Sequence, residues 1–212
     1  MKEWLSLYES RSGERGIFSR LAAKNRCEEI GRRDGDQEFG TNPCSEIVLR
    51  PRQFCNLTEV VIRPGDTEET LKEKIELATI LGTWQSTLTN FRYLPSAWKR
   101  NCEEERLLGV SMTGIYDNPL TYTRGPQLEA LLTSLREIAV TTNKKLAKEL
   151  GINQSVAITC VKPSGTVSAL TDTASGIHPR HSYFYVRTVR GDKKDPLTRM
   201  MIDAGFPNED EV

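Results

Sequence analysis

Asn42-Pro43-Cys44-Ser45-Glu46 places a carboxamide, a thiol and a carboxylate within one short stretch of the chain. Pro43 restricts the backbone here, because its ring fixes φ and removes a hydrogen-bond donor. If the stretch is extended, Asn42, Cys44 and Glu46 point to one face, since alternate residues of an extended segment share a face. Cysteine suits redox or radical sulfur chemistry, glutamate is a general base, and asparagine both donates and accepts hydrogen bonds. The stretch therefore indicates a reactive site, although the residues alone also fit a turn that ends in a buried cysteine.

The overall charge of the chain is balanced, with 29 basic and 29 acidic residues among 212. A net charge of zero argues against a dedicated nucleic-acid-binding or membrane-surface protein. No run of apolar residues reaches the ~18 that indicate a transmembrane helix, and the polar N-terminal stretch does not resemble a signal peptide. A chain of this length can bury a core in one or two domains.

The cysteines are odd in number and widely spaced, without a Cys-x-x-Cys pair: Cys27, Cys44, Cys55, Cys102 and Cys160. This pattern argues against a structural zinc site and against a secreted disulfide scaffold. His178 and His181 are separated by Pro179 and have no third ligand nearby, so we expect no metal site. We expect a cytoplasmic protein with one or two working thiols, in which Cys27 is a surface thiol and Cys160 packs in a strand.

Hydrophobic periodicity predicts two long helices. Residues 56–62 are rich in branched side chains and predict a strand that ends at a turn. A first helix is expected after a cap at Asp66 or Thr67, and a second over 127–150, with Gly151 as its cap. The first helix is expected to bury apolar residues spaced three and four apart: Leu71, Ile75, Ala78, Leu81, Trp84 and Leu88.

Weaker patterns predict the remaining elements. Residues 156–161 and 183–189 favour strands, residues 103–116 a helix or a helix followed by a loop, and residues 196–205 a short helix. The charged, glycine-rich stretch 25–40 indicates an exposed connection. Strands and helices alternate along the chain, which is typical of an α/β fold with parallel pairing.

Lys162-Pro163-Ser164-Gly165-Thr166-Val167-Ser168 follows one of the expected strands. Serine and threonine can cap a helix, glycine lets the backbone approach a ligand, and the N–H groups at a helix N-terminus bind phosphate. The lysine precedes the glycine, so this is not a Walker A loop. The residues alone leave two interpretations open, a phosphate-binding loop and an ordinary strand-to-helix turn.

Several of these stretches resemble one family, the ribonucleotide reductases. Asn42–Ile47 resembles their active-site finger loop, and the spacing of Cys44 and Cys55 resembles that of the adenosylcobalamin-dependent class II branch. Lys162–Ser168 resembles the family's substrate-phosphate loop. Three further stretches match in family order: Ser12–Phe18, where Arg15 stands in place of the common proline, Leu108–Gly114 and Ser175–Ser182.

The resemblance implies a fold and an activity. It implies an α/β fold that forms part of a ten-stranded α/β barrel with a central finger loop. Residues 1–212 would be a single partial catalytic-barrel domain, with the finger loop at about 41–55 and the phosphate loop at about 162–168. The implied activity is the reduction of ribonucleotides, preferably triphosphates, to 2′-deoxyribonucleotides by a thiyl-radical mechanism for DNA synthesis.

The resemblance also implies roles for individual residues. Cys44 would carry the thiyl radical that abstracts the 3′-hydrogen of the ribose, Glu46 would accept the 3′-hydroxyl proton, and Asn42 would hold the ribose hydroxyls. Cys55, with a partner cysteine, would supply two electrons. The substrate phosphates would bind at Pro163, Ser164, Gly165, Thr166, Val167 and Ser168. Adenosylcobalamin is the implied cofactor, and a thioredoxin-like reductant and the rest of the reductase polypeptide are the implied partners.

Alternatives to this interpretation remain open. No residue maps onto the family's partner for Cys55, or onto the C-terminal cysteine pair that reduces the site. The chain is therefore expected to be a fragment or one part of a split enzyme that cannot turn over alone. The other candidates are a non-catalytic scaffold that retains the motif, the iron-dependent class of the same family, and a glycyl-radical enzyme.

Overall fold

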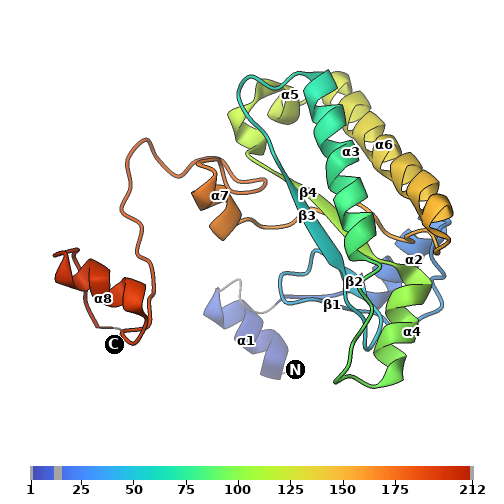
Figure 1. Cartoon of the computed structure of the whole chain (residues 1–212), viewed down its shortest axis with the longest axis horizontal. Coiled ribbons are helices and arrows are strands. Elements are labelled where there is room, and N and C mark those ends of the chain that lie inside the picture. Colours follow the sequence, from blue (N-terminus) through green and yellow to red (C-terminus); the bar gives the residue numbers. More distant parts are fainter. Residues whose placement is uncertain (1, 12–15, 211–212) are drawn as a thin grey trace. The chain divides into compact units, whose positions relative to one another are not determined.

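The computed structural model of the chain describes residues 2–11 and 16–210 (Figure 1). It divides into two compact units after Arg180, and each unit is described by itself. The first family stretch, Ser12–Phe18, falls partly on residues 12–15, which lie outside the described residues. The expectation of one partial barrel domain over 1–212 stays a prediction.

A parallel pair of strands forms the centre of the first unit. β3 (Asn56–Val61) pairs with β4 (Leu108–Thr113) from Asn56 opposite Leu108 to Val61 opposite Thr113. The predicted strand at 56–62 is thereby confirmed. Residues 156–161 lie beside β4, but they make a single parallel bridge between Val110 and Thr159 rather than a full strand.

The prediction of a helix over 103–116 is wrong for most of its length. Helix α4 (Ser96–Glu105) ends at Arg106, whose backbone is left-handed, and β4 begins at Leu108. A short 3-10 helix, η1 (Ile115–Asp117), follows β4. Almost every residue of β4 is buried, so its sequence shows neither the helical period nor the strand period, and a short run of this kind is ambiguous.

Two long helices cover one face of the strands. α3 (Glu68–Gln85) begins at a capping box formed by Thr67 and Thr70, and α6 (Pro126–Leu150) ends at Gly151 in a left-handed conformation. The two helices lie side by side against β3 and β4 (Figure 1). The core between the layers is apolar: Val60, Ile62, Leu71, Ile75, Ala78, Leu108, Val110, Leu131, Leu135, Ala139 and Ile158.

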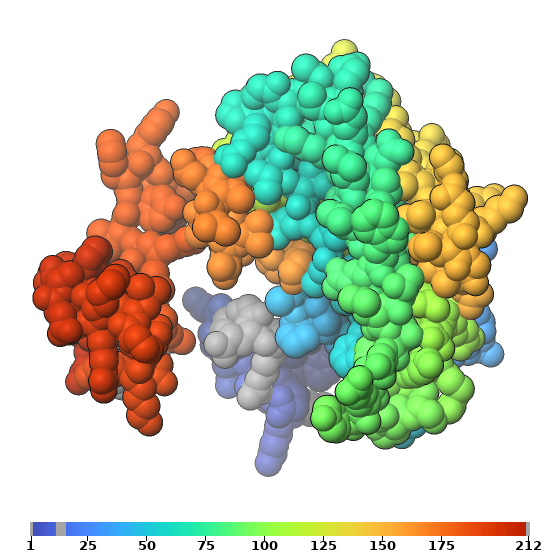
Figure 2. All heavy atoms as spheres, in the orientation of Figure 1, coloured from blue at the N-terminus to red at the C-terminus, as the bar shows by residue number. Residues whose placement is uncertain are grey.

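The expected buried stripe of α3 is correct only for its first half. Leu81, Trp84 and Leu88 are exposed, with 56%, 52% and 72% of their surfaces accessible. Small side chains replace them in the interior, because even a Cβ atom added at Gly82 would already be in van der Waals contact with Leu108 and Thr58. The outer surface of α3, in teal and green, is open in the space-filling view (Figure 2).

The N-terminal part of the first unit contains more regular structure than predicted. α1 (Lys2–Ser10) and α2 (Arg20–Ile30) precede an antiparallel hairpin of β1 (Gly40–Thr41) and β2 (Val48–Leu49). The expected exposed connection at 25–40 is partly helical. The expectation that Cys27 is a surface thiol is wrong, because Cys27 is buried with Ala23 and Phe39.

Two short helices complete the first unit, and the second unit is mostly irregular. α5 (Pro119–Tyr122) follows η1, and α7 (Thr166–Leu170) follows the predicted phosphate loop. In the second unit the short helix α8 (Pro196–Asp203) is confirmed.

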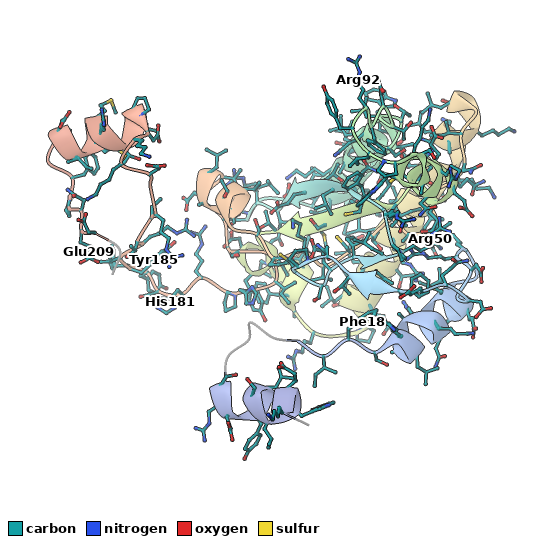
Figure 3. All side chains as sticks on the ribbon, turned by 90° about the horizontal axis from the view of Figure 1, so that it is seen from below. Phe18, Arg50, Arg92, His181, Tyr185 and Glu209 are labelled. Carbon is teal, nitrogen blue, oxygen red and sulfur yellow. The ribbon has the colours of Figure 1, made fainter. Side chains whose placement is uncertain are left out.

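The predicted strand at 183–189 is wrong. Its residues are irregular and exposed, and in the described part of the chain no strand pairs with it. Tyr185 lies on this stretch and His181 precedes it (Figure 3), and their rings meet edge to face. An alternating apolar pattern needs a neighbouring strand before it becomes a β-strand.

The described residues thus form a mixed α/β structure, as expected, with two separate two-stranded sheets. These sheets do not form a closed barrel within residues 2–11 and 16–210. None of the described helices is long and apolar enough to cross a membrane.

Candidate active site

Residues 42–47 form the turn of the β1–β2 hairpin. The Asn42 carbonyl accepts a hydrogen bond from the Ser45 N–H at 3.0 Å, and the Asn42 Oδ1 accepts one from the Ile47 N–H at 3.0 Å. Ser45 adopts a left-handed backbone with φ of 62°. The condition of an extended stretch is therefore not met, and the turn, rather than strand alternation, sets the direction of its side chains.

The turn separates an exposed thiol from a buried carboxylate. Cys44 is exposed, whereas the Glu46 side chain is 0% exposed. The Lys162 Nζ lies 2.9 Å from Glu46 Oε1. The second oxygen, Glu46 Oε2, is buried and has no hydrogen-bond partner among the described residues.

Opposing effects act on the pKa of Glu46. Burial raises it, but the hydrogen bond and positive charge of Lys162 and the nearby amide of Asn42 together outweigh burial, so the pKa lies below its ordinary value. The hydrogen bond to Glu46 likewise raises the pKa of Lys162, to which the nearby Cys44 and Cys160 also contribute. The pair is therefore charged over a wide pH range.

Two further thiols lie near this ion pair. Cys55 and Cys160 are both half-buried. Burial, and then the negative charge of Glu46, raises the pKa of Cys55, and the same effects raise the pKa of Cys160 to about 12. Both are therefore neutral thiols at neutral pH, and such thiols react poorly as nucleophiles.

Gly109 of β4 makes room for Cys160. A Cβ atom at this position would lie 3.1 Å from Cys160 Sγ, 3.0 Å from Ile47 Cδ1 and 2.4 Å from Leu57 Cδ2. These contacts bring the hairpin, β3 and residues 156–161 together over one glycine. Cys160 is therefore part of the site and not simply packed in a strand, as the sequence suggested.

The predicted phosphate loop begins directly after Lys162. Ser164 Oγ accepts a hydrogen bond from the Ser168 N–H at 3.2 Å, and Ser168 Oγ donates to the carbonyls of Ser164 and Gly165. Ser164 and Ser168 are buried and hold the turn, whereas Pro163, Gly165, Thr166 and Val167 are exposed. The exposed members of the loop are therefore the ones that a ligand can reach.

Residues 175 and 176, at the start of the family stretch Ser175–Ser182, pack against this loop. Ser175 Oγ donates to the Ser164 carbonyl, and the Gly176 N–H donates to Thr113 Oγ1 at 2.9 Å. Gly176 has a φ of +54°, and a Cβ there would lie 3.0 Å from the Lys162 carbonyl oxygen. Glycine at this position therefore lets residues 175–176 approach the phosphate loop and the end of β4.

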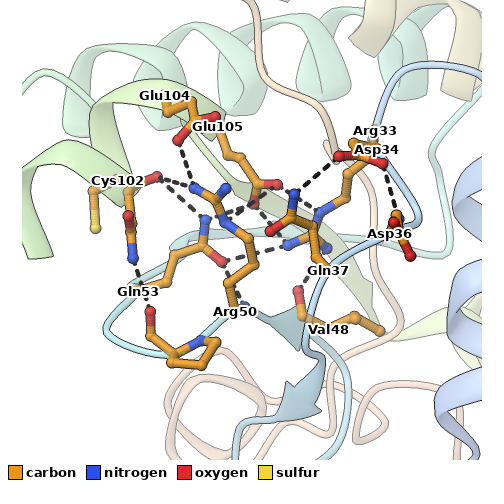
Figure 4. A network of polar contacts seen from close by, with 12 residues as sticks. Arg33, Asp34, Asp36, Gln37, Val48, Arg50, Gln53, Cys102, Glu104 and Glu105 are labelled. Carbon is orange, nitrogen blue, oxygen red and sulfur yellow. Dashed lines mark hydrogen bonds and ion pairs between the residues drawn. The ribbon is translucent and has the colours of Figure 1, made fainter. Parts of the chain in front are cut away.

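A buried polar network fixes the base of the hairpin (Figure 4). Arg33 binds both carboxylate oxygens of Glu105, at 3.1 and 2.7 Å, and donates to the Val48 carbonyl at 2.8 Å. Gln53 donates to Glu105 Oε2, and Arg50 reaches Glu104 at 3.0 Å. The network connects β2 to α4.

The structure brings together most of the residues that the sequence singled out. Asn42 helps to lower the pKa of Glu46, and the charge of Glu46 raises the pKa of Cys55. Cys44 lies near Lys162. Lys162 and Cys160 were not predicted as site residues. Their spacing of two in an extended segment places them on one face, which is the signal that could have found them.

Comparisons with known proteins relate this chain to the ribonucleotide reductases. No family model matches the chain. The chain is 30% identical over 204 residues to an adenosylcobalamin-dependent ribonucleoside-triphosphate reductase of Lactobacillus acidophilus, which covers 84% of this chain and 27% of that protein. It is 30% identical over 172 residues to the protein of the same name from Euglena gracilis, covering 79% of this chain and 22% of that protein.

A solved structure agrees with these relatives. A crystal structure described as a B12-dependent, class II ribonucleotide reductase matches with a TM-score of 0.57 and 29% identity, over 68% of this chain and 23% of that one. The chain is thus a relative of the class II ribonucleotide reductases and corresponds to a segment of their catalytic polypeptide. It spans about a quarter of the length of the curated relatives.

The histidines do not contribute to a metal site in the described structure. No group of three or more His, Cys, Asp or Glu side chains that could hold a metal ion occurs in residues 2–11 and 16–210. His178 instead contacts the carbonyl of Ser175 at 3.2 Å.

Proposed function

We propose that this chain carries the reacting thiol, the base and the substrate-phosphate loop of an adenosylcobalamin-dependent ribonucleoside-triphosphate reductase. The observation that carries this proposal is the hairpin turn in which the exposed Cys44 stands beside the buried, ionised Glu46. Relatives with that named activity match over 84% of the chain. The reaction converts a ribonucleoside triphosphate to its 2′-deoxy form.

Cys44 is the group that starts the chemistry on the sugar. As a thiyl radical it takes the 3′-hydrogen atom of the ribose and becomes a thiol, leaving a carbon radical at C3′. Glu46 takes the proton of the 3′-hydroxyl, for which its ionised state and its unpartnered Oε2 are suited. The 2′-hydroxyl then leaves as water with a proton supplied by one of the reducing thiols. At the end of the reaction the Cys44 thiol returns its hydrogen atom to C3′ and becomes a thiyl radical again.

Asn42 has two tasks in this proposal. Its Oδ1 closes the turn by accepting from Ile47, while its amide contributes to the lowered pKa of Glu46. The same amide is the group that would hydrogen-bond the ribose hydroxyls. Loss of Asn42 is therefore expected to affect both the shape of the turn and the position of the sugar.

Cys55 supplies electrons in the second half of the reaction. Two thiols together give up two electrons and two protons and become a disulfide, which balances the removal of the 2′-oxygen as water. The family resemblance places the partner of Cys55 elsewhere in the polypeptide. Burial keeps the Cys55 thiol protonated until it is used, since its pKa is raised.

The substrate phosphates are assigned to Pro163–Ser168. In this loop Gly165, Thr166 and Val167 are exposed and begin α7, while Ser164 and Ser168 maintain its shape. Lys162 joins the loop to Glu46 through a 2.9 Å ion pair. A nucleotide bound by its phosphates would thereby lie within reach of the hairpin turn.

The relatives' names state a dependence on adenosylcobalamin, and we assign this cofactor to the site as its radical source. Its cobalt–carbon bond supplies the radical when the cofactor is bound. Cys44 suits that source because its side chain is exposed at the turn and can be reached from outside this segment. Within this chain the residue that meets the cofactor's chemistry is thus Cys44.

The proposal includes the rest of the machinery by family analogy. The chain would complete a ten-stranded barrel with the remaining polypeptide, take electrons from a thioredoxin-like protein, and work in the cytoplasm. Because the relatives are about four times as long as the matched segment, the isolated chain is not expected to turn over.

A complementation assay tests the function. Ribonucleoside triphosphate, adenosylcobalamin and a dithiol are incubated with the chain alone, and with the chain plus the remaining polypeptide of a relative, and deoxynucleotide is measured. Activity is expected only in the complemented mixture and is expected to vanish in Cys44→Ser.

The matched control is Cys102→Ser. Cys102 is buried and accepts a hydrogen bond from the Phe54 N–H, a contact that a serine hydroxyl can also make. This variant should retain activity. A folded, complemented mixture without activity would overturn the proposal, as would a Cys44→Ser variant that is as active as the parent.

A further inference from the structure

Lys162 is a partly buried cation to which the proposed reaction gives no chemical role. Its Nζ lies 2.9 Å from Glu46 Oε1, although the two residues are far apart in the sequence. The Glu46 side chain is 0% exposed and the Lys162 side chain 27% exposed. The carboxylate therefore depends on the protein, rather than on water, to stabilise its charge.

The other titratable groups that face Glu46 cannot replace this cation. The negative charge of Glu46 acts on Cys55, which directly precedes β3, and on Cys160 in the segment beside β4, while Cys44 on the hairpin lies near Lys162. All three are thiols, and a thiol is either neutral or negative. Of the groups that face Glu46 in the described structure, Lys162 alone carries positive charge.

The ion pair also decides which carboxylate oxygen is available. Lys162 occupies Oε1, while Oε2 is buried without a hydrogen-bond partner in the described part of the chain. An unpartnered buried oxygen is costly, and such groups persist where a function needs them. Oε2 is thus the atom left to accept a proton from a bound sugar.

We propose that Lys162 is a positioning residue that keeps Glu46 deprotonated and leaves its Oε2 free to act as the base, an inference that rests on the proposed function of Glu46. Without Lys162 the buried carboxylate faces burial alone, which favours its protonated form. Glu46 would then hold its proton at higher pH and could not accept one from the substrate.

The first experiment measures the protonation of Glu46 in the whole chain. The side-chain carboxyl carbons of glutamate are labelled with ¹³C and followed by NMR across pH, and the Glu46 signal is identified by its loss in Glu46→Gln. In Lys162→Gln the midpoint of Glu46 is expected to rise by about one pH unit or more. Lys162→Arg, which keeps the charge, should restore most of the original midpoint.

A matched control separates a local effect from a general one. Lys74 forms a similar ion pair with Asp66, at 2.6 Å, elsewhere in the first unit. Lys74→Gln should leave the Glu46 midpoint unchanged. If Lys162→Gln also leaves it unchanged while the spectrum remains that of a folded protein, the proposal is overturned.

A second measurement connects the pair to turnover. In the complemented enzyme the acid limb of the pH–rate profile is expected to move to higher pH in Lys162→Gln, with partial recovery in Lys162→Arg. A uniform loss of rate at every pH would contradict a role through Glu46. Complete inactivity of the parent enzyme would count against the proposed function only, because the NMR titration tests Lys162 independently of catalysis.

Discussion

The two faces of the β3–β4 sheet differ in the polarity of their side chains and in the segments that those side chains contact. The face toward α3 and α6 is covered by apolar side chains such as Val60 and Leu108. The opposite face carries Leu57 and Glu59 and contacts the hairpin and Cys160 through Gly109. Glu59 Oε1, like Glu46 Oε2, is buried there without a hydrogen-bond partner among the described residues. The first face stabilises the fold, and the second holds polar groups at a cost in stability.

The largest effect is expected on the helix-covered face. Leu71 is 0% exposed and packs in the core, so Leu71→Ala should lower the free energy of unfolding by about 2–5 kcal/mol. The matched control on the same helix is Leu77→Ala, because Leu77 is 61% exposed and its loss should change stability by less than about 0.5 kcal/mol. Chemical denaturation measures both, and equal effects would contradict the assignment of the two sides of α3.

A smaller effect is expected where the opposite face is most crowded. Gly109→Ala would place a methyl group 2.4 Å from Leu57 Cδ2 and close to Ile47 and Cys160, which should cost about 1–3 kcal/mol. Gly65→Ala is the control, since a Cβ at Gly65 meets no atom within 4 Å. If thermal unfolding shows the same midpoint for both variants, the close packing of hairpin and strand is wrong.

The rate of thiol alkylation should distinguish Cys44 on the hairpin turn from Cys160 in the segment beside β4. Cys44 is exposed, whereas burial raises the pKa of Cys160 to about 12. Iodoacetamide at neutral pH is therefore expected to label Cys44 at least ~10-fold faster than Cys160, because the thiolate is the reactive form. Mass spectrometry of timed digests gives both rates in one sample, and faster labelling of Cys160 would show that its surroundings are more open than described.

The smallest expected effect is a pH dependence of stability that arises from Glu46. Its folded pKa is below the unfolded value of about 4.3, so its contribution is fully present above that value and is lost as pH falls through the folded pKa. Glu46→Gln should therefore lose less stability than the parent between about pH 5 and pH 3. Parallel denaturation curves at both pH values make the comparison, and identical losses would argue against a lowered pKa.

The sequence predicted secondary structure correctly where one face of a helix or strand packs against the apolar core. The apolar repeats of 127–150 and the branched residues of 56–62 predicted α6 and β3, because their side chains pack on one continuous layer. The same rule failed for the second half of α3, where Gly82 and Thr83 take the buried positions in place of larger residues. Helical spacing shows that a face exists, but not which residues the neighbouring strand can accommodate.

Long-range contacts account for most of what could not be predicted at the site. The asparagine, cysteine and glutamate of the hairpin were recognised from their types, but the turn that arranges them depends on hydrogen bonds that Asn42 accepts from Ser45 and Ile47. The ion pair of Lys162 with Glu46 joins two distant segments, and no local pattern indicates it. The same holds for Arg33 and Glu105, whose positions along the chain show no periodic relation.

The buried contacts of Arg33 have a consequence for protein engineering. Arg33, Gln53 and Glu105 fasten the base of the hairpin to α4, while the turn with Cys44 stays exposed. The reactive loop is therefore not a portable module. A graft onto another scaffold would have to include α2, the hairpin and α4 together, because the loop alone would lack the buried polar contacts that fix its conformation.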